Sequence, residues 1–162
     1  MENLKRNSFL KIPFIRALVF VLILLMTSGC LTGISTFDQQ AYTTTASLKV
    51  DALCLMDSAQ DKYTNHINEV NALSKNLMKI YEYEKHRPKN EKTVEQWDLL
   101  LNKDGHLLGA FLSKWEKGVV MNPAYISSRK EQISTAFDLI LGLEIHKNQK
   151  NNHNLIIWQS LM

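Results

Sequence analysis

Apolar and polar residues recur with the period of an α-helix over most of the chain after residue 36. The segment 36–85 contains neither proline nor glycine, and its apolar residues return at steps of three or four. These positions are Leu48, Ala52, Leu55, Ala59, Tyr63, Ile67, Val70, Leu73, Leu77 and Ile80. Such spacing gathers apolar side chains on one helix face. The pattern therefore predicts a single long amphipathic helix over 36–85.

A second helix is predicted over 91–118. The turn Arg87-Pro88-Lys89-Asn90 separates it from the first helix, because proline disfavours helical geometry at the residue before it. Asp104-Gly105 interrupts the apolar stripe and predicts a kink or break. Gly118 and Asn122-Pro123 are expected to end this helix. Its apolar face consists of Val94, Trp97, Leu101, Leu108, Phe111 and Trp115.

A third helix is predicted over 128–147. Ser128-Arg129-Lys130-Glu131 has the S-x-x-E form of a capping box, which satisfies free amide groups at a helix N-terminus. Ile133, Phe137, Ile140 and Leu141 give the apolar face. The fold expected is all-α: a small helical bundle or an elongated helical hairpin, built on one long N-terminal helix and two shorter helices. The bundle is favoured because it buries more apolar surface per residue.

The first thirty residues follow a different pattern. A basic stretch, MENLKRNSFLKIPFIR, precedes ten consecutive apolar residues, ALVFVLILLM (17–26). As a helix at ~1.5 Å per residue, ten residues would cover about half of a ~30 Å hydrocarbon layer. That length is typical of the core of a secretory signal peptide. Small residues, Thr27-Ser28-Gly29, then precede Cys30.

The sequence MTSGC resembles the lipobox of bacterial lipoprotein precursors. In that class the cysteine thiol receives a diacylglycerol, and a peptidase cuts before the cysteine. The resemblance therefore implies lipidation of Cys30. The third position before the cysteine is usually Leu in this class, and here it is Thr27. An uncleaved anchor over 17–34 is the alternative, although Thr, Ser and Gly dilute that stretch and its length is near the lower limit for a span.

The lipobox divides the chain into four expected parts. These are a signal peptide (1–29), a lipidated tether (30–36), a helical domain (37–147), and a flexible polar linker with an apolar tail (148–162). KNQKNNHN (147–154) is polar and without pattern, which predicts flexibility. LIIWQSLM (155–162) is apolar and is expected to dock on the body, to touch the membrane, or to be poorly ordered.

The resemblance also gives an expected location, the cell envelope. In this class Asp after the cysteine favours retention in the inner membrane. Leu31 stands there instead, which implies the outer membrane, facing the periplasm, if the cell has two membranes.

The charge balance argues against nucleic acid as a partner. The chain has 19 basic and 16 acidic residues. Residues 1–29 contain four basic residues and one acidic residue, so 15 of each remain in 30–162. A protein that neutralises phosphates needs a basic surplus, which this domain lacks.

Few residues suggest chemistry. Glu82 and His86 are one helical turn apart, but two ligands do not make a metal site, and no H-x-x-x-H or C-x-x-C occurs. Acid pairs such as Glu82/Glu84 and Asp57/Asp61 have spacings common on helix surfaces. The basic cluster His86-Arg87-Pro88-Lys89, with Lys92, is expected to be a solvated turn rather than an anion site.

Trp97, Trp115 and Cys54 are expected to be structural. The two tryptophans share a helix stripe typical of a core. Cys54 is expected to be a small buried apolar residue, because it lies in Leu53-Cys54-Leu55-Met56. A disulfide between two chains is the alternative for Cys54.

The sequence therefore predicts a protein held in a membrane by lipid on Cys30, acting as a helical protein-binding or structural module with an envelope protein as partner. No catalytic residue, cofactor or metal is expected. The alternative is a helical bundle that binds a small ligand or a lipid. Tight packing of Trp97, Phe111 and Trp115 favours protein contact, whereas a void between them favours a ligand.

Overall fold

A computed structural model describes the backbone of residues 35–161 and the side chains of residues 35–147. This part of the chain contains α-helices and short 3-10 turns and no strand. The helices are α2 (Gln39–Asp57), α3 (Ile67–Lys85), α4 (Glu91–Leu101), α5 (Leu108–Glu116) and α6 (Pro123–Leu161), and the 3-10 turns are η1 (Ser58–Gln60) and η2 (Tyr63–Asn65). The all-α fold and the helical bundle predicted from the sequence are confirmed.

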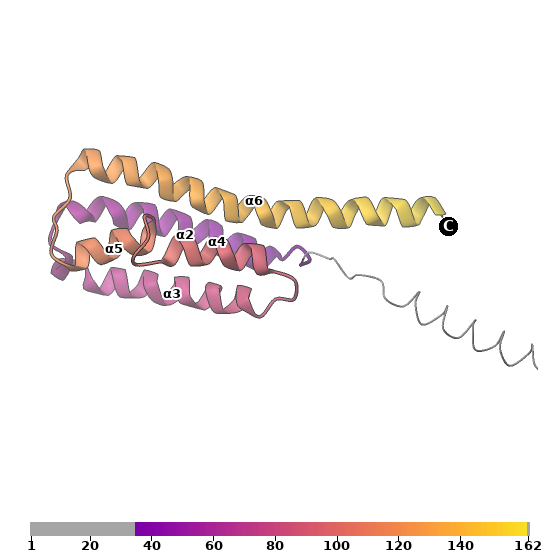
Figure 1. Cartoon of the computed structure of the whole chain (residues 1–162), viewed down its shortest axis with the longest axis horizontal. Helices are drawn as coiled ribbons and strands as arrows, with labels where there is room; N and C mark the ends of the chain where they lie inside the picture. The colour runs from indigo at the N-terminus through magenta and orange to yellow at the C-terminus, as the bar shows by residue number, and fades with distance from the viewer. Residues whose placement is uncertain (1–34, 162) are drawn as a thin grey trace, which may run out of the picture. The chain divides into compact units, whose positions relative to one another are not determined.

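The helices form an antiparallel bundle with up-down-up-down topology (Figure 1). Helix α2 packs against α3 and α6, and α4 packs against the same two helices. Helices α4 and α5 lie end to end and together make the third rod of the bundle (Figure 1). Short connections between antiparallel neighbours are typical of this architecture.

The two ends of the bundle are fixed by hydrogen bonds between distant segments. At one end, here called the Ser35 end, the Ser35 amide donates to the Lys89 carbonyl at 2.9 Å. At the opposite end, the Ala59 end, the Met121 amide donates to the Ala59 carbonyl at 2.9 Å. The first connection, between α2 and α3, therefore lies beside the last one, between α5 and α6.

Each helix contributes a stripe of apolar residues to one core. In α2 the stripe contains small residues, Ala41, Thr45 and Ala52, which let its neighbours approach closely. The other helices contribute larger side chains. They include Leu73, Leu77, Ile80, Trp97, Leu100, Leu108, Phe111, Trp115, Ile133, Phe137 and Ile140. The core is contiguous and lies wholly within residues 34–162, which form one compact unit.

The prediction of one long helix over 36–85 is wrong. The chain turns back on itself at residues 58–66, so that α2 and α3 form a hairpin. A hairpin buries the apolar faces of both halves against one another, which a single extended helix cannot do. Ser58, Asp61 and Asn65 suit the turn, because their side chains compete for backbone groups.

Side-chain and tertiary hydrogen bonds hold this turn. The Asp61 carboxylate accepts from the Lys62 amide at 2.7 Å and from Asn65 Nδ2 at 2.9 Å. Trp115 Nε1 donates to the Asp61 carbonyl at 2.9 Å. Backbone groups that a continuous helix would have paired thus find other partners.

The third predicted helix begins earlier than its capping box. Helix α6 starts at Pro123, and the Asn122 side chain accepts a hydrogen bond from the Tyr125 amide at 2.8 Å. Asparagine is a favoured N-cap, and proline is favoured at the first helical position. Asn122-Pro123 therefore opens this helix, and Ser128–Glu131 lies inside it.

Helix α6 also continues beyond its predicted end at residue 147. Its backbone is helical to Leu161, through the residues that composition predicted to be a flexible linker and a tail. The segment 143–161 contains neither proline nor glycine, so nothing in it forces the helix to stop. Within the described range, no helix is both long enough and apolar enough to cross a membrane.

The predicted break at Asp104-Gly105 is confirmed, since α4 ends at Leu101 and α5 begins at Leu108. The Asn102 side chain accepts from the Asp104 amide at 2.9 Å and so shapes the loop. Gly109, at the start of α5, packs directly against the end of α4. A Cβ atom there would lie 2.1 Å from the Leu101 carbonyl oxygen.

Replacing Gly109 by alanine should therefore destabilise the bundle. Because the obstacle is backbone, we expect Gly109→Ala to lower the free energy of unfolding by about 3 kcal/mol. Gly142→Ala is the matched control, because a Cβ atom at this helical position meets nothing within 4 Å. It should raise stability by about 0.5–1 kcal/mol through helix propensity. Urea unfolding of both variants measures the difference, and equal effects would contradict this account of the break.

Candidate functional site

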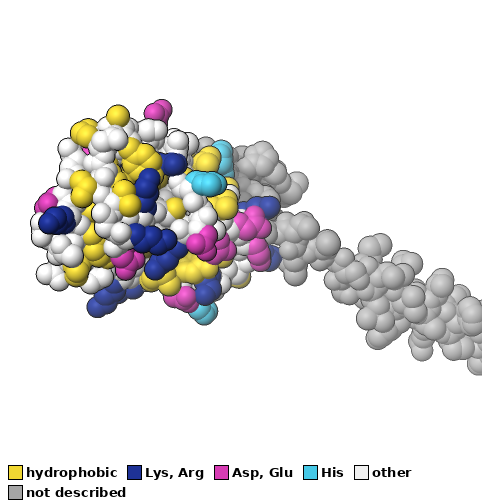
Figure 2. Space-filling view, turned by 60° about the vertical axis from the view of Figure 1, so that its left-hand side comes forward, with side chains coloured by type: hydrophobic (Ala, Val, Ile, Leu, Met, Phe, Trp, Pro, Cys, Tyr) yellow, Lys and Arg dark blue, Asp and Glu magenta, His cyan; other side chains and the backbone are white. Residues whose placement is uncertain are grey.

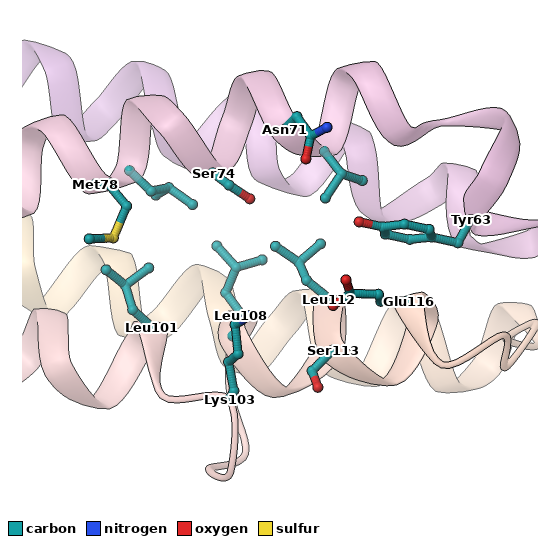
Figure 3. A pocket seen from close by; sticks show the side chains of 13 residues that line it. Tyr63, Asn71, Ser74, Met78, Leu101, Lys103, Leu108, Leu112, Ser113 and Glu116 are labelled. Carbon is teal, nitrogen blue, oxygen red and sulfur yellow. The ribbon is translucent and has the colours of Figure 1, made fainter.

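A groove lies between α3 and the α4–α5 rod (Figure 3). Its volume is about 380 Å³. Helix α3 contributes Asn71, Ser74 and Met78 to it, and the opposite wall includes Leu101 and Leu112 (Figure 3). The groove therefore faces solvent between two helices and is not enclosed in the core.

The floor of the groove is apolar and its rim is polar. Val70, Leu77 and Leu108 are buried and form part of the floor. The rim carries Lys103 from the α4–α5 loop and Glu116 from the end of α5. Apolar surface with polar groups around it is typical of recognition sites.

The break between α4 and α5 accounts for the position of the groove. Helix α5 packs on α4 and on η2, whereas α3 packs on α2 and α4. The close contact of Gly109 with the end of α4 fixes the point where α5 restarts. The groove therefore lies where a continuous third helix would have been expected to pack along α3.

A buried network of four charged side chains occupies the Ser35 end. Glu84 and Arg87 come from the end of α3 and the turn after it, and Glu144 and Lys147 come from α6. Arg87 Nη1 contacts Glu84 at 2.9 Å, Arg87 Nη2 contacts Glu144 at 2.8 Å, and Lys147 Nζ contacts Glu144 at 2.6 Å. Each of the four side chains is less than a tenth exposed. Two positive and two negative charges compensate one another, as burial requires.

Neutral groups complete this network. Lys147 Nζ also donates to Asn90 Oδ1 at 2.6 Å and to Thr93 Oγ1 at 3.0 Å. The Asn90 side chain donates in turn to the Glu84 carboxylate and, at 2.9 Å, to its carbonyl. The network thus connects α3, α4 and α6.

The same network holds the start of the described chain. Arg87 donates to the Thr36 carbonyl, and Glu144 Oε1 accepts from the Asp38 amide at 2.7 Å. The Asp38 side chain caps α2 by accepting from the Ala41 amide at 2.9 Å, and it also accepts from the Tyr83 hydroxyl. The segment before α2 is therefore fastened to both α3 and α6.

The electrostatics of the network favour its ionised form. Burial opposes ionisation of Glu144, but hydrogen bonds from Arg87 and Lys147 outweigh it and lower the pKa of the carboxyl below 4.5. The hydrogen bond from Tyr83 is the main cause that lowers the pKa of Asp38. The cluster is saturated with internal partners, so it acts as a structural clamp and not as a ligand site.

The aromatic stripe is packed, as its spacing predicted. Trp97 contacts Phe137 edge-on with ring centroids 6.1 Å apart, and Trp115 contacts Tyr63 in the same manner at 5.6 Å. Phe111 stacks on Tyr125 at 6.4 Å. None of the three stripe residues, Trp97, Phe111 and Trp115, lines the groove.

In the basic cluster, His86, Pro88, Lys89 and Lys92 are exposed, as predicted for a solvated turn, and only Arg87 departs from that prediction. Arg87 points inward to the carboxylates of Glu84 and Glu144, because these buried acids require a positive partner. Lys92 is exposed and pairs with Glu95 at 3.5 Å. Charges of both signs are interspersed on the face seen in Figure 2.

Glu82 and His86 do not meet through their side chains. His86 Nδ1 lies 2.7 Å from the Glu82 carbonyl oxygen, while the Glu82 carboxylate pairs with Lys85 at 3.0 Å. Among the residues that the structure describes, no group of three or more potential metal ligands is brought together.

The two members of each predicted acid pair have different surroundings and partners. Glu82 is exposed, whereas Glu84 is buried in the network. Asp57 pairs with Lys130 across the bundle at 2.7 Å, whereas Asp61 holds the α2–α3 turn.

Cys54 is exposed, and the prediction that it is buried is wrong. The buried stripe of α2 passes through Ala52 and Met56, and a residue midway between them points to the opposite side. The disulfide between two chains stays the untested alternative. The signal peptide 1–29 and the lipidated Cys30 lie outside the described residues.

Sequence reasoning missed the residues of the buried network. Glu84 continues the buried stripe of α3, and Glu144 and Lys147 continue that of α6. Glu84 and Glu144 lie one helical turn after Ile80 and Ile140, on the same helix face. A charged residue at such a core position was the sequence signal that could have predicted the network.

Comparisons with models of protein families, with curated proteins and with solved structures found no match for this chain.

Removing one carboxylate should test the buried network. We expect Glu144→Gln to lower the free energy of unfolding by about 3 kcal/mol, because Arg87 and Lys147 lose a shared partner. A carboxyl with a lowered folded pKa stabilises above its unfolded pKa and loses that effect as pH falls. The difference from the wild type should therefore shrink as pH is lowered below 4.5.

Glu95→Gln is the matched control, since its pair with Lys92 is exposed. Its effect should stay below about 0.5 kcal/mol. Urea unfolding across pH measures both variants. Equal and small effects would show that the network does not stabilise the bundle.

Proposed function

We propose that this protein is a lipid-anchored module of the cell envelope that binds a partner protein through the groove between α3 and α5. The observation that carries the proposal is the groove itself, where Met78 and the half-buried Leu101 and Leu112 leave apolar surface open to solvent above a buried floor. An exposed apolar surface with a polar rim is typical of a protein interaction site.

The anchor follows from the sequence before the bundle. MTSGC places a cysteine five residues before Ser35. Five residues span at most about 18 Å when fully extended. Lipid on Cys30 would therefore hold the Ser35 end close to the membrane surface. By the lipobox rule for Leu31, that membrane is the outer one, facing the periplasm, in a cell with two membranes.

The dimensions of the groove suit an amphipathic helix. Its α3 wall runs from Val70 to Met78, which is about 12 Å at the rise of a helix. A partner helix presents anchors at positions i, i+4 and i+7 over a similar length. Met78 is 49% exposed, and methionine adapts its shape to different apolar partners.

The packing of the aromatic stripe favours this function over the alternative. A cavity for a small ligand or a lipid was expected as a void between Trp97, Phe111 and Trp115. These three rings each pack against other aromatic side chains in the core. We propose no catalytic role, because Asp38 and Glu144, whose pKa values are lowered, serve the structural clamp.

Acylation of Cys30 can be tested directly. Metabolic labelling with a fatty-acid probe should mark the wild type and leave Cys30→Ser unlabelled. The variant should also migrate as a precursor about three kilodaltons heavier, since the signal peptide stays attached. Label retained by Cys30→Ser would contradict the lipid anchor.

Binding at the groove can be tested in native membranes by placing a photo-crosslinking amino acid at Asn71, an exposed position on the groove. We expect a discrete adduct with an envelope protein. Met78→Lys should abolish the adduct, because a lysine in the groove opposes apolar contact.

Val50→Lys is the matched control, since Val50 is 59% exposed on α2 and does not line the groove. It should leave the adduct unchanged. An adduct that survives Met78→Lys, or that Val50→Lys also abolishes, would contradict the groove as the binding surface.

A further inference from the structure

We propose that the segment 155–162, which begins in the last part of α6, inserts into the same membrane that holds the lipid on Cys30. This inference rests on the proposed lipidation and adds a second attachment to it. The ligand is the lipid bilayer, and the attachment is peripheral, within one leaflet.

The first observation is where α6 leaves the bundle. Glu144 contacts the Asp38 amide, and Lys147 contacts Asn90 and Thr93, so α6 reaches the Ser35 end at these residues. The helix then continues beyond the other helices to Leu161 (Figure 1). Ser35, where the described chain begins, and the extension of α6 thus lie at the same end of the bundle.

The second observation is a match of lengths. Fourteen residues of helix follow Lys147 up to Leu161, which is about 21 Å at 1.5 Å per residue. Cys30 can lie no farther than about 18 Å from Ser35. A membrane that holds Cys30 therefore lies within reach of the end of α6.

The third observation is the composition of the extension. Residues 148–154, NQKNNHN, are polar throughout, whereas LIIWQSLM (155–162) contains no charged residue. Leu155 to Trp158 are four consecutive apolar residues, which any helix distributes around its whole circumference. A helical turn that is apolar on all sides favours an apolar environment.

The length of the apolar segment decides the mode of attachment. Eight residues fall far short of the roughly 20 that cross a bilayer. They match a short insertion at the interface, where tryptophan is favoured because it has an apolar ring and a polar N–H. The backbone of α6 extends past the other helices before it reaches Leu161 (Figure 1).

The test uses lipid-free protein of residues 31–162, which contains the whole compact unit 34–162. The probe is a vesicle of phosphatidylethanolamine with a minor share of phosphatidylglycerol. We expect the protein to float with the vesicles. The double variant Ile156→Asn/Ile157→Asn should weaken partitioning by about tenfold or more, because two large apolar side chains are lost from the interface.

The double variant Val50→Asn/Leu139→Asn is the matched control. These two apolar residues are 59% and 57% exposed on the bundle, so the change is similar in kind but lies outside 155–162. It should leave partitioning within about twofold of the wild type. Equal losses in both double variants would show that the bundle surface binds the vesicle and would overturn the proposal.

Fluorescence gives a second readout. Brominated acyl chains should quench the emission of Trp158, and Trp158→Phe should abolish that quenching. Trp97 and Trp115 are 0% exposed and serve as an internal background. Absence of vesicle binding, or quenching that persists without Trp158, would overturn membrane insertion of this segment.

This assay involves neither lipid on Cys30 nor a partner in the groove. Its failure would therefore leave the proposed anchor and the proposed binding surface intact. Failure of Cys30 acylation, with vesicle binding retained, would instead overturn the anchor and leave the segment 155–162 as an attachment of its own.

Discussion

The buried pairing of Arg87 and Lys147 with Glu84 and Glu144 is the constraint on which the bundle depends. Four charges without water are tolerated only in an arrangement that gives each of them a partner. That arrangement brings the ends of α3 and α6 together with the start of α4. Apolar side chains at these positions would pack in many rotations of the helices. The charged network allows only the one arrangement in which each charge has its partner.

The third rod of the bundle is interrupted between α4 and α5, and the fold is kept. Helices α4 and α5 follow a single path, and a loop separates them. At this junction the backbone of Gly109 packs directly against the backbone of Leu101, so the two helices contact through backbone atoms and not through a helix face. Trp97 anchors α4 and Trp115 anchors α5 on either side of that junction. Beside this junction, Met78 of α3 remains 49% exposed at the groove.

The helical class, most of the apolar face of each helix from α3 to α6 and the break at Asp104-Gly105 could be predicted, because each depends on local spacing or on glycine. The predicted faces were wrong at Ile67, which is exposed, and in α4, where Leu100 is buried and Leu101 only half-buried. The turn at residues 58–66 could not be predicted. Ala59, Tyr63 and Ile67 happen to continue the helical period through it, and its stability comes from distant groups such as Trp115. The exposure of Cys54 and the groove depend likewise on how helices rotate against one another, which a single stripe does not specify.

The attachment of residues 35–38 has a mechanical consequence. Tension applied through the preceding chain enters at Ser35, where the Lys89 carbonyl, the Arg87 guanidinium and the Glu144 carboxylate share it among several segments. A pull on this end is therefore borne by the turn after α3 and by α6 before it can separate α2 from its neighbours.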